Sequence, residues 1–252
     1  SMGGLWVDYE RTVDGGLRVG SPRNQVTNIP GLYAIGECDY QYHGANRLGA
    51  NSLVSCIFSG LIVAPGVQSL FRSQTGKLAS EQDASLFERE RQRHQEQFEG
   101  LLRRPAGGPN PYRIHEQLGE LMTTAATVVR RNEQLREAYE CVSDLEQQAH
   151  HCSLSDTGNW ANQNVAFARD LTDMFPLAKA ILRGALLRDE CRGAHYKPEF
   201  SMPSLQAEDP RQRRAEAEAW CDRFEELNQR WLKSTIAEYQ PDEPRISYEP
   251  VD

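Results

Sequence analysis

Residues 31–53 constrain the chain more than any other segment, because they join a short apolar run to a carboxylate, an arginine loop and the start of an uncharged helix. The residues between Gly31 and Gly36 are apolar and bounded by turn signals, which predicts a buried strand. Glu37 follows at the carboxyl end of that strand, where open α/β sheets present groups to ligands. Gly36 is expected to let a ligand approach the backbone closely. A glycine–glutamate pair after a strand is common, so this pair alone is a weak signal.

Arg47 lies in a loop between Gly44 and Gly49, which suggests a backbone that passes close to another group. A guanidinium is planar and forked, and it matches a carboxylate with two parallel hydrogen bonds. A structural arginine that ties the loop to a neighbouring carboxylate fits the same pattern equally well. Residue type leaves both an anion site and a structural ion pair open.

The 19 residues from Leu53 to Phe71 include no charged side chain. Asn51 and Ser52 precede them as good N-cap residues, and the first turn has no acidic residue, so its N–H groups are free for an external anion. The length of the stretch raises a transmembrane alternative. Serines, glycines and Pro65 dilute its hydrophobicity, which favours a helix buried on all sides and broken or kinked near Pro65.

Composition excludes some classes of protein. The chain has 252 residues with 39% hydrophobic content, enough for a sizeable core in one or two domains, and its formal charge of −8 argues against a nucleic-acid surface. Six cysteines without a C-x-x-C pair favour reduced cytosolic thiols, and Cys38 is interpreted as a small buried filler rather than a ligand contact. No metal site is predicted, because the adjacent residues 150–152 (His-His-Cys) lack a second ligand pair and fit a helix end better.

The remainder of the chain reads as mostly helical. A charged helix is predicted over residues 80–103, with residues 80–83 as a capping box, followed by a linker at 104–111. Apolar residues at 3/4 spacing then predict two long helices, over residues 114–145 and 160–185. Facing apolar stripes and a short connection imply an antiparallel helical bundle.

Three further features are predicted in the second half. Pro176 is expected to kink the second long helix, and residues 192–195 (Arg-Gly-Ala-His) form a helix-ending loop with Gly193 at its turn. A charged helix follows over about Pro210 to Gln229. Segments 231–239 and 244–248 alternate loosely and predict a hairpin.

Three motifs resemble the flavoprotein subunits of succinate dehydrogenase and fumarate reductase. Residues 31–53 match that family's G-L-(Y/F)-A-x-G-E strand and its H-G-A-N-R-L-G-(G/A)-N-S-L loop. Residues 192–195 match the family's R-G-A-H loop. Residues 1–8 resemble its H-Y-x-M-G-G-(L/I)-x-V-(D/N) return strand without the first two residues of that motif. Residues 246–252 resemble a subgroup tail that stops early. The resemblance therefore spans most of the chain in family order.

The resemblance implies an α+β fold. Residues 1–75 would form the C-terminal part of an FAD-binding α/β domain, and residues 76–190 an antiparallel helical-bundle domain. Residues 191–252 would form a tail with the R-G-A-H loop, a helix and a possible hairpin.

The resemblance also implies roles for residues of the first motif. Glu37 would bind the ribityl chain of FAD, and Arg47 would bind a substrate carboxylate beside the flavin. The backbone N–H groups of Ser52 and Leu53 would contact the isoalloxazine ring. His43 would orient the loop or touch substrate, with the orienting role favoured. No catalytic residue is assigned within the chain.

By resemblance, the function is interconversion of succinate and fumarate by hydride transfer to and from FAD, as in the tricarboxylic acid cycle and respiratory electron transport. Electrons would pass to an iron–sulfur subunit, and a membrane-anchor subunit would hold the complex indirectly at the cytoplasmic face of the cell membrane. No G-x-G-x-x-G is present, and a substrate-binding histidine of the family would precede Ser1. The chain is therefore expected to be an incomplete piece, inactive alone.

Two alternatives remain open. L-Aspartate oxidase shares the glutamate strand and the H-G-A-N-R loop but typically continues Met-Ala-Ser-Asn-Ser-Leu, whereas residues 48–53 here are Leu-Gly-Ala-Asn-Ser-Leu. The chain could instead be a non-catalytic helical interaction module. The direction of physiological turnover is not determined by the sequence, because oxidation and reduction use one site.

Overall fold

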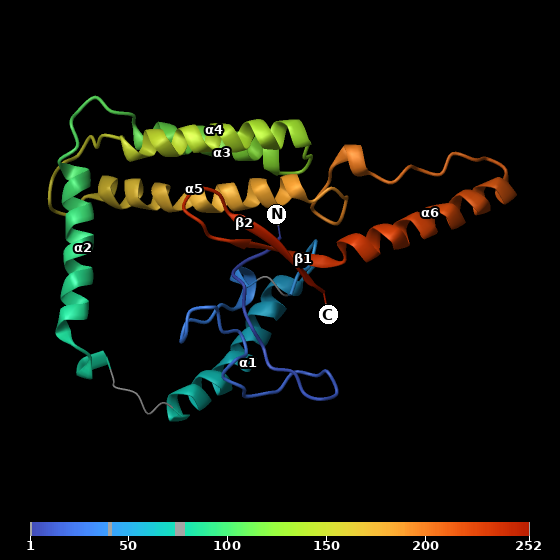
Figure 1. Cartoon of the computed structure of the whole chain (residues 1–252), viewed down its shortest axis with the longest axis horizontal. Helices are drawn as coiled ribbons and strands as arrows, with labels where there is room; N and C mark the ends of the chain where they lie inside the picture. Colours follow the sequence, from blue (N-terminus) through green and yellow to red (C-terminus); the bar gives the residue numbers. More distant parts are fainter. Residues whose placement is uncertain (1, 40–41, 74–78, 252) are drawn as a thin grey trace. The chain divides into compact units, whose positions relative to one another are not determined.

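The computed structural model describes residues 2–39, 42–73 and 79–251. The chain divides into two compact units, one of residues 1–82 with 192–194 and one of residues 83–191 with 195–252 (Figure 1). Each unit is described by itself. Ser1 and the domain boundary expected at residues 75 and 76 lie outside the described residues.

The first unit contains little regular strand. The segments predicted as strands at residues 5–8 and 31–36 are extended but make only isolated bridges, which pair Leu5 with Asp39, Asp8 with Val26 and Val26 with Tyr33. The predicted continuous strands are therefore wrong for these residues. A strand needs a partner along its whole length, and these segments find one at single positions only.

Helix α1 (Asn51–Ser73) runs unbroken through Pro65 in the first unit, so the predicted break is not seen. Its buried residues recur at spacings of three and four and so lie along one side of the helix: Ser55, Ser59, Ile62 and Gly66. The prediction of burial on all sides is wrong, because Leu53 and Leu61 are 75% and 69% exposed. Among the described helices, α1 has the length and apolar composition to cross a membrane, a test that core helices of other proteins also pass.

The second unit begins with helix α2 (Ala84–Leu102), which is exposed over most of its length, while Phe98, Leu101 and Leu102 near its end pack against the core. The predicted capping box is wrong, because residues Ala79–Glu81 form a separate 3₁₀ turn, η2. Asp83 caps the helix instead, since its side chain accepts a hydrogen bond from Ser85 N at 2.9 Å.

Three helices form the core of the second unit: α3 (Pro111–Ala126), α4 (Asn132–His150) and α5 (Gln163–Leu187). The single helix predicted over residues 114–145 is therefore two. The chain leaves helical geometry at Thr127, and Arg130 N donates to Tyr196 O at 2.9 Å instead of to a carbonyl one turn back. Asn132, which interrupts the apolar stripe, begins the second helix.

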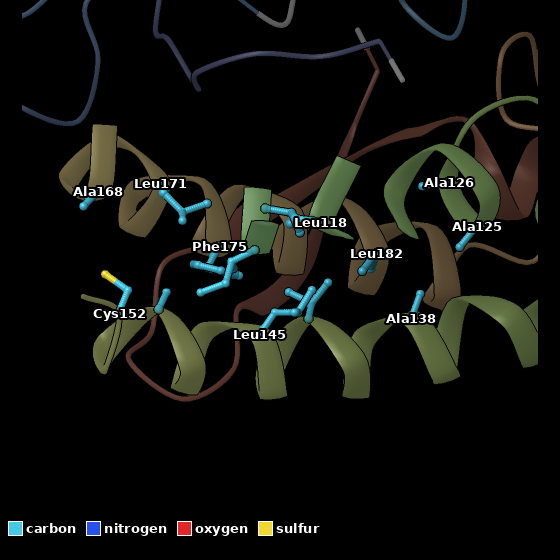
Figure 2. Close-up of a cluster of buried hydrophobic side chains, with 14 of the residues drawn as sticks. Leu118, Ala125, Ala126, Ala138, Leu145, Cys152, Ala168, Leu171, Phe175 and Leu182 are labelled. Carbon is cyan, nitrogen blue, oxygen red and sulfur yellow. The ribbon is translucent and has the colours of Figure 1, made fainter. Parts of the chain in front are cut away.

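Apolar side chains from all three helices meet between them. Phe175 and Leu182 of α5 are fully buried (0% exposed) and point into the same interior as Leu118 of α3 and Leu145 of α4 (Figure 2). Trp160, predicted to open the α5 stripe, lies outside the helix and is 92% exposed. The predicted helical bundle is otherwise confirmed, and with it the α+β fold.

Other local predictions can be compared directly. Helix α5 includes Pro176 within its continuous span, and the kink expected there stays a prediction. Helix α4 ends at His150, as the helix-end interpretation requires. No group of three metal-ligand side chains gathers anywhere in the described part of the chain.

The C-terminal elements follow the sequence closely. Helix α6 (Pro210–Trp231) starts behind Asp209, whose side chain accepts from the N–H groups of Arg211 and Gln212. Strands β1 (Lys233–Glu238) and β2 (Arg245–Pro250) pair antiparallel, so the predicted hairpin is confirmed. A 3₁₀ turn, η3 (Pro198–Phe200), precedes α6.

Candidate functional site

The site predicted in residues 31–53 is built on the 3₁₀ turn η1 (Gly36–Cys38) and on α1. Gly36 has a φ of +68°, its N–H donates to Ser59 Oγ at 3.2 Å, and an added Cβ would lie 2.8 Å from Cys56 Sγ. Its close contact is therefore with α1, and the expected ligand approach at Gly36 stays a prediction. The glycine allows η1 to pack closely against α1. The Glu37 side chain is 59% exposed.

His43 lies beside Glu37 and is nearly buried, with 6% of its side chain exposed. Its Nε2 is 3.3 Å from Glu37 Oε2 and 3.5 Å from Ser55 Oγ. A carboxylate only accepts hydrogen bonds, so Nε2 carries the proton in the neutral imidazole. Nδ1 is then an acceptor, and it is buried without a hydrogen-bond partner among the described residues. This geometry links His43 to the glutamate and to α1.

Arg47 is exposed in the loop that follows. Its guanidinium has no hydrogen bond or ion pair to any side chain or carbonyl within the described part of the chain. The structural ion pair that the sequence left open is therefore not present there. A forked cation without an internal partner is available to a carboxylate ligand.

Helix α1 presents its N-terminus next to this loop. Asn51 and Ser52 are already helical residues rather than caps, since the helix begins at Asn51 after Ala50, whose φ is +64°. The first turn has no acidic side chain and Leu53 is 75% exposed. Unpaired N–H groups and the positive end of the helix dipole remain available to an electron-rich ligand.

The R-G-A-H loop contacts the H-G-A-N-R loop within the first unit. Ala194 N donates to Ala45 O at 2.9 Å. Gly193 has a φ of +55°, and an added Cβ would lie 2.5 Å from the same carbonyl oxygen. This contact joins the R-G-A-H loop to the H-G-A-N-R loop of the same unit. Residue spacing alone indicated only a turn.

Sequence reasoning missed a buried polar cluster where the R-G-A-H loop enters the second unit. His195 Nδ1 accepts from Arg130 Nη1 at 2.7 Å, and His195 Nε2 donates to Arg188 O at 2.8 Å. Lys197 is 0% exposed and is 2.9 Å from Asp189 Oδ1. The partners are up to 65 residues apart, so no local pattern marks them.

The pKa values of this cluster follow from burial. Burial is the main cause that lowers the pKa of His195 from 6.5 to about 4; the Arg188 carbonyl opposes the shift, and the charges of Arg130 and Lys197 add to it. Burial likewise lowers the pKa of Lys197, although Asp189 partly offsets it. His195 is therefore a neutral hydrogen-bonded link and not a general acid at neutral pH.

Cys38 differs from its prediction. It is exposed at the outer side of η1, not buried, so the filler interpretation is wrong. All six cysteines are free thiols, as the scattered spacing predicted.

The family models match both parts of the chain. The model described as fumarate reductase flavoprotein C-term matches residues 115–252, and an FAD binding domain matches residues 1–53. The succinate dehydrogenase flavoprotein subunit of Bacillus subtilis is 36% identical over 254 residues, covering 100% of this chain and 37% of the relative. The fumarate reductase flavoprotein subunit of Proteus vulgaris is 28% identical, covering 89% and 33%. The chain thus spans about a third of these relatives' length.

Solved structures share the fold. E. coli quinol fumarate reductase gives a TM-score of 0.68 at 23% identity, covering 91% of this chain and 35% of that one. An adenylylsulfate reductase from Archaeoglobus fulgidus gives 0.59 at 19% identity, covering 91% and 33%. The same fold therefore occurs in proteins named for different reactions, and fold alone does not decide the substrate.

Fold, motifs and family models together place the chain among the FAD-binding flavoproteins. The chain belongs to the succinate dehydrogenase and fumarate reductase flavoprotein family.

The residues present are compatible with FAD. Glu37 offers an exposed carboxylate to hydroxyl groups, and the first turn of α1 offers N–H donors with no competing acid. Leu53 adds an exposed apolar surface suited to a ring system.

Proposed function

We propose that the protein to which this chain belongs interconverts succinate and fumarate with FAD. The observation that carries the proposal is the exposed, internally unpartnered Arg47, which shares one short segment with an exposed carboxylate and an uncapped helix N-terminus. This chemistry suits a dicarboxylate beside a flavin, and the family of the chain supports it.

FAD, when bound, supplies the hydride acceptor and donor. The Glu37 carboxylate accepts hydrogen bonds from the ribityl hydroxyls. The backbone N–H groups of Ser52 and Leu53 would donate to the pyrimidine side of the isoalloxazine ring. Their position at the positive end of α1 favours the reduced, more negative state of the flavin.

Arg47 binds one carboxylate of the substrate through its two parallel N–H donors, and so holds and polarises the dicarboxylate. His43 orients the site by donating Nε2–H toward Glu37 at 3.3 Å, which keeps the carboxylate facing the ribityl chain. Contact of His43 with substrate is the weaker role, because only 6% of its side chain is exposed.

Further partners are part of the same proposal. An iron–sulfur subunit would take up the electrons, and a membrane-anchor subunit would attach the assembly at the cytoplasmic face of the cell membrane. The relatives named quinol fumarate reductase support a chain of carriers toward quinol. The boundaries 1–75, 76–190 and 191–252 remain proposed domain limits.

The 252 residues alone are proposed to be inactive, since they include no G-x-G-x-x-G turn for the FAD pyrophosphate. Purified chain should not reduce dye with succinate. Robust FAD-dependent succinate turnover by the chain would contradict this part of the proposal.

The main experiment uses the full-length flavoprotein. Succinate-driven dye reduction is compared with aspartate-driven peroxide formation on the same preparation. Succinate activity without aspartate activity supports the proposal. Aspartate activity would assign the protein to the L-aspartate oxidase alternative, and neither activity nor FAD binding would favour a non-catalytic module.

A further inference from the structure

A buried chain of hydrogen bonds lies beneath the turn that carries Glu37. Gly36 N donates to Ser59 Oγ of α1 at 3.2 Å, and Ser59 is 0% exposed. The Ser59 side chain also forms a hydrogen bond with the hydroxyl of Tyr42. Helix α1 thus joins the turn to the residue that precedes His43 in the chain.

Gln25 extends this chain of hydrogen bonds from Tyr42 to a buried carboxylate. The amide orientation that satisfies its neighbours has Nε2 donating to Asp39 Oδ2 at 2.6 Å and the amide oxygen accepting from the Tyr42 hydroxyl at 2.7 Å. Since Tyr42 has one O–H, the serine is the donor in its bond with Ser59. Gln25 and Asp39 are 3% and 2% exposed. Asp39 N also donates to Gly36 O at 3.3 Å, which links the last member to the first.

The side-chain bonds of this set, which we call the Tyr42 relay (residues 25, 36, 39, 42 and 59), all run in one direction. Hydrogen bonds in series polarise one another, and a fully satisfied buried network fixes one arrangement of its members. Burial is the main cause that raises the pKa of Tyr42, although the hydrogen bond from Ser59 opposes the shift. The hydroxyl therefore stays neutral at neutral pH and can act both as acceptor and as donor.

The relay holds two parts of the candidate site. Glu37 lies in η1, in the turn between the two ends of the relay. Tyr42 opens the loop that leads to Arg47, five residues further on. The Arg47 guanidinium has no bond of its own to the described residues, so the placement of its loop decides where it lies. A change at Tyr42 can therefore reach the substrate arginine without touching it.

We propose that Tyr42 is a positioning residue for dicarboxylate binding, because its hydroxyl fixes the start of the Arg47 loop against the Glu37 turn. The inference rests on the proposed function, since it concerns the same site. The Tyr42 ring has a separate contact, edge-on to Phe58 with ring centroids 5.8 Å apart. Loss of the hydroxyl alone should therefore loosen the loop and keep the packing of the ring.

The test compares two tyrosines of the same unit. Tyr42→Phe in the full-length flavoprotein removes the hydroxyl and keeps the ring. Tyr33→Phe is the matched control, because Tyr33 is also half-buried and its hydroxyl donates one hydrogen bond, to Pro22 O at 2.9 Å. Thermal unfolding and the flavin-to-protein ratio establish that both variants are folded and loaded. A merely structural role predicts that the two variants behave alike.

Dicarboxylate affinity is read from the absorbance change of the bound flavin on titration with malonate. Malonate has a single carbon between its carboxylates and cannot form the C=C bond of fumarate, so binding is measured without turnover. We expect the malonate Kd to rise about three- to tenfold in Tyr42→Phe, the loss expected of one hydrogen bond, and less than about twofold in Tyr33→Phe. Succinate KM should rise with the malonate Kd while kcat changes less, because the binding lost is common to substrate and transition state.

Ser59→Ala is a second variant of the relay. It removes the partner of Tyr42 in α1 and should raise the malonate Kd at least as much as Tyr42→Phe. The double variant should bind malonate no more weakly than Ser59→Ala alone, because both changes break one chain of bonds. Additive effects of the two changes would overturn the relay.

The outcomes separate this inference from the function on which it rests. A malonate Kd that is unchanged in Tyr42→Phe, or that rises equally in Tyr33→Phe, overturns the positioning role and leaves the proposed function intact. If the flavin of the wild-type protein does not respond to malonate, both the proposed function and the role of Tyr42 are overturned.

Discussion

At the residue scale, Arg47 carries the substrate assignment because its guanidinium is exposed and has no partner within the described chain. Arg47→Lys keeps the charge but removes the fork. In the full-length flavoprotein we expect kcat/KM for succinate to fall by about 10²-fold or more, with FAD content unchanged. Steady-state dye reduction and flavin absorbance on one preparation measure both quantities. Normal turnover would remove Arg47 from the site.

Glu37→Gln tests the proposed contact between Glu37 and the ribityl chain of FAD. Glutamine keeps the shape of the side chain but loses the charge and one strong acceptor, and it weakens the contact with His43 Nε2 at 3.3 Å. FAD content should fall before succinate KM changes. If flavin content stays normal after purification, the proposed ribityl contact is incorrect.

Gly193 tests the contact between the two loops. Its φ is +55° and an added Cβ would lie 2.5 Å from Ala45 O, a backbone atom that cannot rotate away. Gly193→Ala should therefore lower stability by about 1–3 kcal/mol and loosen the loop. Gly119→Ala in α3 is the control, because nothing lies within 4 Å of its Cβ and it should gain about 0.5–1 kcal/mol. Equal melting temperatures for the two variants would contradict the contact.

At the element scale, the three-helix core depends on a few large side chains. Phe175 of α5 is 0% exposed and lies among residues of α3 and α4 (Figure 2). Phe175→Ala should cost about 3–5 kcal/mol, because transfer and cavity terms add. Leu177→Ala on the same helix is the control, since Leu177 is 65% exposed and should change stability by less than about 1 kcal/mol. Denaturant unfolding followed by circular dichroism compares them.

The elements also show where local sequence signals suffice. Helix α6 begins where Pro210 predicts, and the hairpin follows within two residues of its expected limits. Caps, proline positions and alternation act over a few residues, so a single segment carries the whole signal. The break between α3 and α4 was missed, because it depends on a backbone bond from Arg130 to Tyr196, 66 residues away in the chain.

At the scale of the whole molecule, the buried cluster around His195 couples stability to pH. In the folded protein the pKa of His195 is lowered from 6.5 to about 4. As the pH falls, this histidine is therefore protonated near pH 6.5 in the unfolded chain but only near pH 4 in the folded protein. Stability contributed by neutral His195 is complete above pH 6.5 and is lost as the pH falls from 6.5 toward 4. After allowance for partial solvent access, the loss should be about 2 kcal/mol.

His195→Gln provides the test of this coupling. Glutamine can still donate to Arg188 O and accept from Arg130, but it does not titrate. Unfolding free energies measured between pH 7 and pH 4 should decline less steeply for the variant. Parallel declines in both proteins would show that His195 does not cause the acid sensitivity.

The sequence by itself determined the family motifs, the helical bundle, α6 and the hairpin. Each rests on a signal within one segment: the residues 31–53 motif, the apolar stripes of α4 and α5, and the proline at the start of α6. The candidate site residues were predicted by resemblance, and Arg47 was left open by residue type alone, because a guanidinium suits a ligand and a structural ion pair equally well.

Only the tertiary structure decided which surface each segment presents. It assigned Gly36 to a contact with α1, left the apolar side of α1 exposed, and joined Gly193 to Ala45. It also buried His195 beside Arg130. Burial and close approach depend on what a distant part of the chain places against a residue, and that information is not present in the local spacing of any one motif.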